Sequence, residues 1–196
     1  PNAPANEFPS KVLAGVGVAF YVMAALGQQL AADGLIDAAE ARSICASCLD
    51  IVALGTVADL VPLDHNNRVL VAQGMARIRA GRTRPGVLAL FSAAGRDHRD
   101  AVTGDLGFAI APRLNAAGRL TDMTVGINCL LEQDQERALV IARELSQLNL
   151  RRRELQAEMQ SDAELQLDEL EEQLGTAVTE ALCLYDDRWH QGIVGL

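Results

Sequence analysis

Aromatic side chains are scarce in this sequence. They make up 4% of the 196 residues, so a core has to be built mainly from alanine, leucine and valine, a mixture that favours packed helices. Few rings are left to stack against nucleobases, which is a common way of gripping single strands. Hydrophobic residues nevertheless make up 49% and charged residues 22%, which excludes a globally disordered chain.

Lysine is almost absent. Lys11 is the only lysine among the 17 basic residues, and all the others are arginines. The formal net charge of −9 argues against a surface that coats nucleic acid indiscriminately, but it leaves room for a local basic groove. Arginine suits bidentate phosphate contacts, although the base composition of a genome produces the same bias.

The four cysteines, Cys45, Cys48, Cys129 and Cys183, are scattered, and neither a signal peptide nor a long apolar span is evident. Cys45 and Cys48 have no second such pair and no histidine nearby. We interpret them as small buried residues rather than zinc ligands. These features indicate a reducing, cytoplasmic compartment.

A single carboxylate interrupts the apolar residues 51–63. Asp59 has only apolar neighbours in sequence, and a carboxylate in apolar surroundings requires a cation, a metal ion or backbone amides. Gly55 permits a bend before it, and Pro62 stops any helix after it. We predict that Asp59 lies at the end of a buried element and points into a cleft. Asn67 and Arg68 follow it and are available to orient it, with a solvated helix start as the equal alternative for these two residues. A cap or turn aspartate is the alternative.

Apolar periodicity predicts helices in the first half of the chain. Residues 11–32 are apolar nearly all round, so we expect a buried helix with Ser10 as its N-cap. Asp37 caps a second helix that reaches about residue 49, and Asp64 begins a third that reaches about residue 79. Pro85 begins a short fourth helix.

Two arginines and an amide lie among small residues at positions 112–119. Arg113 and Arg119 are six positions apart, with Asn115 between them. Two guanidinium groups so placed can address different phosphate oxygens or neighbouring phosphates. A salt bridge to one of the 26 acidic residues is the alternative for either arginine.

No proline or glycine occurs between about residues 134 and 174, where leucines recur at helical spacing. At ~1.5 Å per residue such a helix is about 60 Å long, so it bridges two bodies, pairs with a partner or breaks. We interpret Arg151, Arg152 and Arg153 in its middle as solvated, with phosphate binding as the alternative.

A short apolar run at residues 181–185 predicts a strand after the long helix. Residues 186–190 make a turn, and residues 191–196 begin a helix. A strand, a turn and a helix start in that order can bind an anion at the helix N-terminus. His190 is the histidine best placed for a polar role.

Four stretches of the sequence together resemble one known family. The first stretch is residues 53–63, Ala-Leu-Gly-Thr-Val-Ala-Asp-Leu-Val-Pro-Leu. It resembles the fourth motif of the DHH phosphoesterases, and in particular that of the RecJ-type single-stranded-DNA exonucleases. Residues 13–20, 107–120 and 189–196 agree with the family in order and approximate spacing. The resemblance therefore spans almost the whole chain.

The resemblance implies a chemistry and a set of residues. Members of this family hydrolyse phosphodiester or phosphoanhydride bonds with two divalent metals, usually Mn²⁺ or Mg²⁺. One metal lowers the pKa of the attacking water, and both neutralise charge on the phosphate. By resemblance Asp59 is a catalytic metal ligand, and Arg113, Asn115, Arg119 and His190 bind the substrate.

The same resemblance implies single-stranded DNA as the partner, degraded from 5′ to 3′ in DNA repair and recombination. A single-strand-binding protein and a helicase are further expected partners, and no membrane is expected. The family's earlier aspartate motifs, its Asp-His-His triplet and its Gly-Gly-His motif are missing here. One carboxylate cannot hold two hard cations that each take about six ligands, so we expect these residues alone to be inactive.

The expected fold is mainly α, from an α/β parent. Residues 1–132 are assigned to the helical C-terminal part of a DHH domain, 133–175 to a long connecting helix, and 176–196 to the beginning of a DHH-associated domain with its first strand and helix start. The sequence opens at Pro1 without an initiator methionine and stops at Leu196, so we expect a piece of a longer protein.

Two other functions remain open. A DHH-type pyrophosphatase, or a phosphodiesterase for oligonucleotides or cyclic dinucleotides, is the alternative within the superfamily. A non-enzymatic interaction module that pairs through residues 134–174 is the alternative from another class. The arginine segment and the length of the helix favour the exonuclease.

Overall fold

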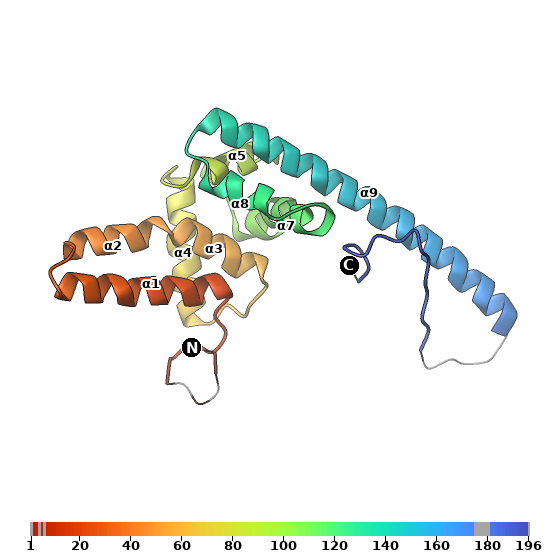
Figure 1. The fold of residues 1–196 in the computed structure, drawn as a ribbon, viewed down its shortest axis with the longest axis horizontal. Coiled ribbons are helices and arrows are strands. Elements are labelled where there is room, and N and C mark those ends of the chain that lie inside the picture. Colours follow the sequence, from red (N-terminus) through yellow and green to blue (C-terminus); the bar gives the residue numbers. More distant parts are fainter. Residues whose placement is uncertain (1, 4, 6, 175–180, 196) are drawn as a thin grey trace.

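The computed structural model describes residues 2, 3, 5, 7–174 and 181–195, and the described part is helical without a strand (Figure 1). This confirms the expected mainly-α fold. The elements, in chain order, are α1 (Gly15–Ala32), α2 (Ala38–Ser47), α3 (Leu49–Ala58), α4 (His65–Arg79), α5 (Pro85–Ala93), η1 (His98–Asp100), α6 (Thr103–Asp105), η2 (Leu106–Ile110), α7 (Ala111–Leu120), α8 (Thr124–Leu131) and α9 (Gln135–Leu174).

Local capping chemistry explains where three helices begin. The Asp37 carboxylate accepts a hydrogen bond from the backbone N–H of Ala39 at 2.6 Å and so caps α2. Asp64 accepts from the N–H of Asn67 at 2.8 Å and caps α4, and this bond lowers the pKa of the Asp64 carboxyl. Pro85 occupies the first turn of α5. All three predicted starts are confirmed.

The main core lies between α3, α4, α5, η2, α7, α8 and the first turns of α9. Ala138, Ala142 and Leu145 of α9 are completely buried in it. Their spacing of four and three residues places them on one face of the helix. The first third of α9 is therefore part of this core rather than a free connector.

The rest of α9 extends away from the other helices, and the C-terminal segment runs back alongside it (Figure 1). Arg188 forms an ion pair with Asp162 at 3.4 Å, and Gln166 donates a hydrogen bond to the Tyr185 carbonyl at 3.5 Å. The long helix predicted from the missing prolines and glycines is confirmed, and residues 185–195 pack against its later half.

Helix α1 differs from its prediction. It begins at Gly15 after Ala14 rather than at a Ser10 cap, and of its residues only Gly17 is buried. The prediction of a buried helix is wrong. Among the described residues, α2 and α3 pack against one side of α1, and the apolar side chains on its other side are exposed.

The predicted absence of a long apolar span is also wrong. Gly15–Ala32 and Ala38–Ala58 are long and apolar enough to cross a membrane by length and composition alone. Core helices of other proteins meet the same test, so the finding is weak by itself.

The C-terminal prediction is corrected as well. Residues 181–185 form no strand, because the described part of the chain contains no other strand with which their backbone groups could pair. Instead of a helix start, residues 190–194 form a single turn, in which the N–H groups of Ile193 and Val194 donate to the His190 carbonyl at 2.9 and 3.2 Å. Gly175, where the long helix was predicted to end, lies outside the described residues. So does Leu196, the last residue of the predicted helix start.

Candidate functional site

Asp59 stands at the end of a buried helix, as predicted. It is the C-cap of α3, and its N–H donates to the Gly55 carbonyl at 3.0 Å. The side chain itself is exposed rather than enclosed by apolar neighbours. No bend occurs at Gly55, because α3 runs straight through it; a Cβ there would lie 2.7 Å from Cγ1 of Val16, so this glycine serves the close approach of α1.

Leu60, and not Pro62, reverses the chain after Asp59. Leu60 has a φ of 53°, a left-handed conformation that is rare for a residue with a branched side chain, and 80% of its surface is exposed. It lines a groove of about 250 Å³ together with Val57, Gly107 and Phe108. Asp59 itself is not among the residues that line this groove, so the prediction that its side chain points into a cleft is not confirmed.

Asn67 does not orient Asp59, contrary to the prediction. It is fully buried, and its amide nitrogen donates to the carbonyls of Val12 and Pro62 at 2.9 and 2.8 Å. Asn67 therefore ties the segment before α1 to the loop between α3 and α4.

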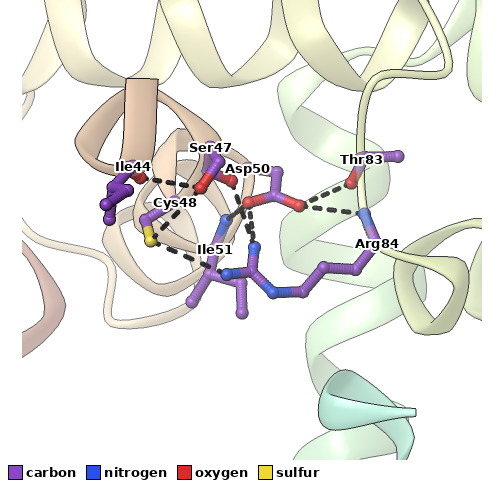
Figure 2. Close-up of polar contacts among 7 residues, drawn as sticks. All are labelled: Ile44, Ser47, Cys48, Asp50, Ile51, Thr83 and Arg84. Atoms are coloured by element: carbon purple, nitrogen blue, oxygen red, sulfur yellow. Dashed lines mark hydrogen bonds and ion pairs between the residues drawn. The ribbon is translucent and has the colours of Figure 1, made fainter. Parts of the chain in front are cut away.

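The buried carboxylate of this region is Asp50, nine residues earlier in the same helix (Figure 2). Asp50 forms an ion pair with the guanidinium group of Arg84 and accepts hydrogen bonds from the Thr83 hydroxyl at 2.7 Å and the Arg84 N–H at 3.2 Å. The N–H of Ile51 also donates to it, at 2.8 Å. Because every oxygen has donors, Asp50 fixes α3 to the start of α5.

Sequence reasoning missed Asp50, although it directly precedes the same apolar run. A carboxylate between Leu49 and Ile51 was the available signal. Its partner could not be inferred, since Arg84 lies 34 residues further along the chain.

The described residues do not by themselves form a metal centre. No group of three or more histidine, cysteine, aspartate and glutamate side chains is placed to hold an ion anywhere in residues 7–174 or 181–195. Asp59 offers one carboxylate, which does not fit the two-metal site that the resemblance implies.

Arg113 is held firmly between α7 and α9. Its Nε donates to the Ser146 hydroxyl at 3.0 Å, and Nη1 donates to the Ala109 carbonyl. Burial lowers the pKa of Arg113, and the nearby charge of Arg153 lowers it further. The salt-bridge alternative is not realised for Arg113 within the described residues.

Arg119 and His190 are brought to the same place. Arg119 Nη1 donates to the Gly192 carbonyl at 3.1 Å, and His190 Nδ1 accepts from the Gly192 N–H at 3.1 Å. A Cβ on Gly192 would lie 2.1 Å from the Arg119 carbonyl oxygen, so only glycine permits this contact. Asn115 is exposed on α7 one turn before Arg119, on the same side of the helix.

Two arginines of α9 join this group. Burial and then the charges of Arg119 and Arg153 lower the pKa of Arg152, whose guanidinium donates to Asn149 at 3.3 Å and Gln156 at 2.9 Å. The prediction that residues 151–153 are solvated did not foresee that Arg152 and Arg153 lie near the arginines of α7. Periodicity does not show which face of a helix meets a neighbour.

Arg113, Arg119, Arg152 and Arg153 form what we call the arginine cluster. The structure assembles it with His190 and Asn115 from α7, α9 and the C-terminal segment. No contact of the described residues joins Asp59 to the arginine cluster.

No family model matches the chain. The whole chain is 51% identical over 197 residues to the single-stranded-DNA-specific exonuclease RecJ of Dickeya dadantii, and 51% identical over 200 residues to that of Escherichia coli. It spans 34% of the length of either relative.

Solved structures agree with the sequence comparison. A crystal structure of exonuclease RecJ bound to manganese matches 99% of this chain and 44% of its own, with a TM-score of 0.75 and 33% identity. RecJ of Thermus thermophilus in complex with Mg²⁺ matches 96% of this chain and 27% of its own, with a TM-score of 0.72 and 34% identity. The resemblance expected from the four sequence stretches is confirmed.

Proposed function

We infer that this chain is one part of a RecJ-type single-stranded-DNA-specific exonuclease, a metal-dependent enzyme that hydrolyses phosphodiester bonds. The observation that carries this inference is the match of the entire chain, at 51% identity, to relatives of that description. The match favours the exonuclease over both a small-substrate phosphoesterase and a helical interaction module.

Asp59 is proposed as one ligand of the metal site. Related structures hold Mn²⁺ or Mg²⁺. The C-terminus of α3 carries the negative end of the helix dipole, and Asp59 adds a full charge there, so the position favours a bound cation. The described residues gather no further ligands around Asp59, so we expect the remaining ligands to come from other parts of the parent protein and these 196 residues to be inactive alone.

The arginines and their neighbours are proposed to hold the DNA. Arg113 is fixed by neutral hydrogen-bond partners, and this leaves its charge available to a phosphate. Arg119, Asn115 and His190 offer further polar groups beside it. Contacts of this kind position the backbone and carry no sequence preference.

Several further properties are part of the proposal rather than of the observations. They are degradation from 5′ to 3′, a role in DNA repair and recombination, contact with a single-strand-binding protein and a helicase, and a cytoplasmic location. The division at residues 132 and 175 also stays a prediction.

The test compares Asp59→Ala with the wild type, using protein expressed from the whole gene. Both are incubated with Mn²⁺ and 5′-phosphorylated single-stranded DNA, beside the matching duplex. We expect the variant to release mononucleotides at least about a hundredfold more slowly, since even second-sphere changes at metal sites cost 10- to 100-fold, and the wild type to spare the duplex.

Asp33→Ala is the matched control, because Asp33 is likewise an exposed C-cap aspartate, at the end of α1. It is expected to keep wild-type activity. Equal activity of Asp59→Ala would make Asp59 an ordinary helix-end carboxylate. Inactivity of the wild type on DNA would favour a small-substrate phosphoesterase.

A further inference from the structure

We propose that Arg152 and Arg153 of α9 bind backbone phosphates of single-stranded DNA and extend along α9 the site that Arg113 and Arg119 begin on α7. The inference rests on the proposed function, because it assigns further residues to the same substrate. It replaces the interpretation of these two arginines as solvated residues of a long helix.

The packing of α7 against α9 places these side chains together. Ser146 of α9 accepts the hydrogen bond of Arg113, which marks the face of α9 that meets α7. Arg153 follows Ser146 by seven residues, which is two helical turns, and so lies on that same face. The charge of Arg153 acts on Arg113, and the charge of Arg119 acts on Arg152, as neighbouring side chains would.

No carboxylate of a described residue forms an ion pair with the arginine cluster. Arg113, Arg119 and Arg152 donate to hydroxyl, carbonyl and amide oxygens, all of them neutral. Arg153 is exposed and makes no ion pair with any described residue. The chain has 26 acidic residues, yet no described one pairs with this cluster. A group of like charges that lacks such a partner is best stabilised by binding an external anion.

The extent of the arginine cluster fits a chain of phosphates better than a single phosphate. Ser146, which anchors Arg113, and Arg153 are seven residues apart on α9, about 10 Å along the helix, and Arg119 adds a further charge at the end of α7. Each guanidinium group offers a planar fork for phosphate oxygens. A grip of this kind is electrostatic and needs no aromatic platform, which agrees with the 4% aromatic content.

Arg151 provides a matched control on the same turn of α9. It is exposed and pairs with Glu154 at 3.5 Å and Glu158 at 3.7 Å. Its charge is therefore already balanced by carboxylates of its own helix, unlike the charges of Arg152 and Arg153.

The experiment measures binding of fluorescent oligothymidylate by anisotropy, with protein from the whole gene and EDTA present to prevent cleavage. Arg152→Gln and Arg153→Gln are each expected to raise the Kd about tenfold, the loss of one charge-assisted contact. The slope of log K against log salt should fall in magnitude by about 0.7 for each phosphate contact removed. Arg151→Gln is expected to match the wild type in both.

The proposal is overturned if Arg152→Gln and Arg153→Gln bind like Arg151→Gln, or if the wild type binds no oligothymidylate. Because Arg152 is partly enclosed, Arg152→Lys separates charge from folding: it should keep the wild-type salt slope and a native circular dichroism spectrum. If the wild type binds DNA through these arginines yet releases no nucleotides with Mn²⁺, the proposed function fails and this inference stands.

Discussion

At the residue scale, the two aspartates of α3 show how position along a helix decides the surroundings of a carboxylate. Asp50 lies in the first turn, where the helix dipole favours negative charge, and Arg84 and Thr83 complete its shell. Asp59 lies at the other end, where the dipole disfavours negative charge, and it is exposed to solvent. Asp50 therefore has a structural role, whereas the carboxylate of Asp59 is available to bind a cation.

Arg84→Met tests the structural role of Asp50. The substitution keeps much of the side-chain volume but leaves a fully buried carboxylate without its cation. Removing one partner of a buried pair costs several kcal/mol, so we expect the free energy of unfolding to fall by about 3 kcal/mol in urea titrations.

Arg99→Met is the control for Arg84→Met. Arg99 also forms an arginine–aspartate pair, with Asp97 at 2.6 Å, but the pair is exposed to solvent, so its loss should lower the free energy of unfolding far less than the loss of the Asp50 pair. Equal effects of the two substitutions would show that the Asp50 pair contributes no more than a surface pair.

At the element scale, the predictions that succeeded rest on local chemistry. Asp37 and Asp64 marked helix starts because a carboxylate cap needs only the next three residues. The long helix followed from the absence of proline and glycine over its length. Each of these signals is complete within a short segment, so tertiary contacts did not alter it.

The predictions that failed depend on partners distant in sequence. The exposure of α1 and the missing strand at residues 181–185 are set by which other segments lie nearby. The arginine cluster likewise depends on the face that α9 turns to α7, which puts Arg113 beside Arg153. The resemblance identified Arg113 and Arg119 in sequence, whereas their neighbours Arg152 and Arg153 required the packing of the helices.

Gly74→Ala tests the crossing of α3 and α4. A Cβ on Gly74 would lie 2.2 Å from the Leu49 carbonyl oxygen and 2.4 Å from Cβ of Ala53, so the two helices have to move apart. Alanine normally stabilises a helix relative to glycine by up to about 1 kcal/mol. Here we expect a loss of about 3 kcal/mol of unfolding free energy, at the upper end for overpacking.

The control is Gly15→Ala at the start of α1, where no atom lies within 4 Å of the added Cβ. Thermal unfolding should show an unchanged or slightly raised Tm for Gly15→Ala and a lowered one for Gly74→Ala. A Gly74→Ala protein at least as stable as the wild type would mean that the close helix crossing does not occur.

At the scale of the whole molecule, the arginine cluster and the exposed apolar side chains of α1 lie on different elements. The net charge of −9 coexists with the arginine cluster, so any polyanion is directed to one region of an otherwise acidic surface. Helices α1 and α2, which carry exposed apolar side chains, lie at the other end of the fold from the later half of α9 (Figure 1). The proposed DNA-binding residues and the apolar surface of α1 therefore lie on different elements.

The apolar surface predicts how these 196 residues behave by themselves. Val22 and Leu26, one turn apart on α1, are 64% and 56% exposed and form an apolar surface on this helix. An apolar patch of this kind promotes association in water. We expect the 196-residue chain to self-associate with rising concentration in sedimentation velocity experiments, and the double substitution of Val22 and Leu26 by glutamine to reduce this association.

Leu165→Gln is the control for that experiment, because Leu165 is 61% exposed but lies far along α9. It should leave the self-association unchanged if α1 carries the contact. If Leu165→Gln reduced association instead, the chains would associate through α9 rather than through α1. That result would support the alternative of an interaction module that pairs through the long helix. A chain that stays monomeric at every concentration would contradict the prediction, since hydrophobic burial is the only driving force that it invokes.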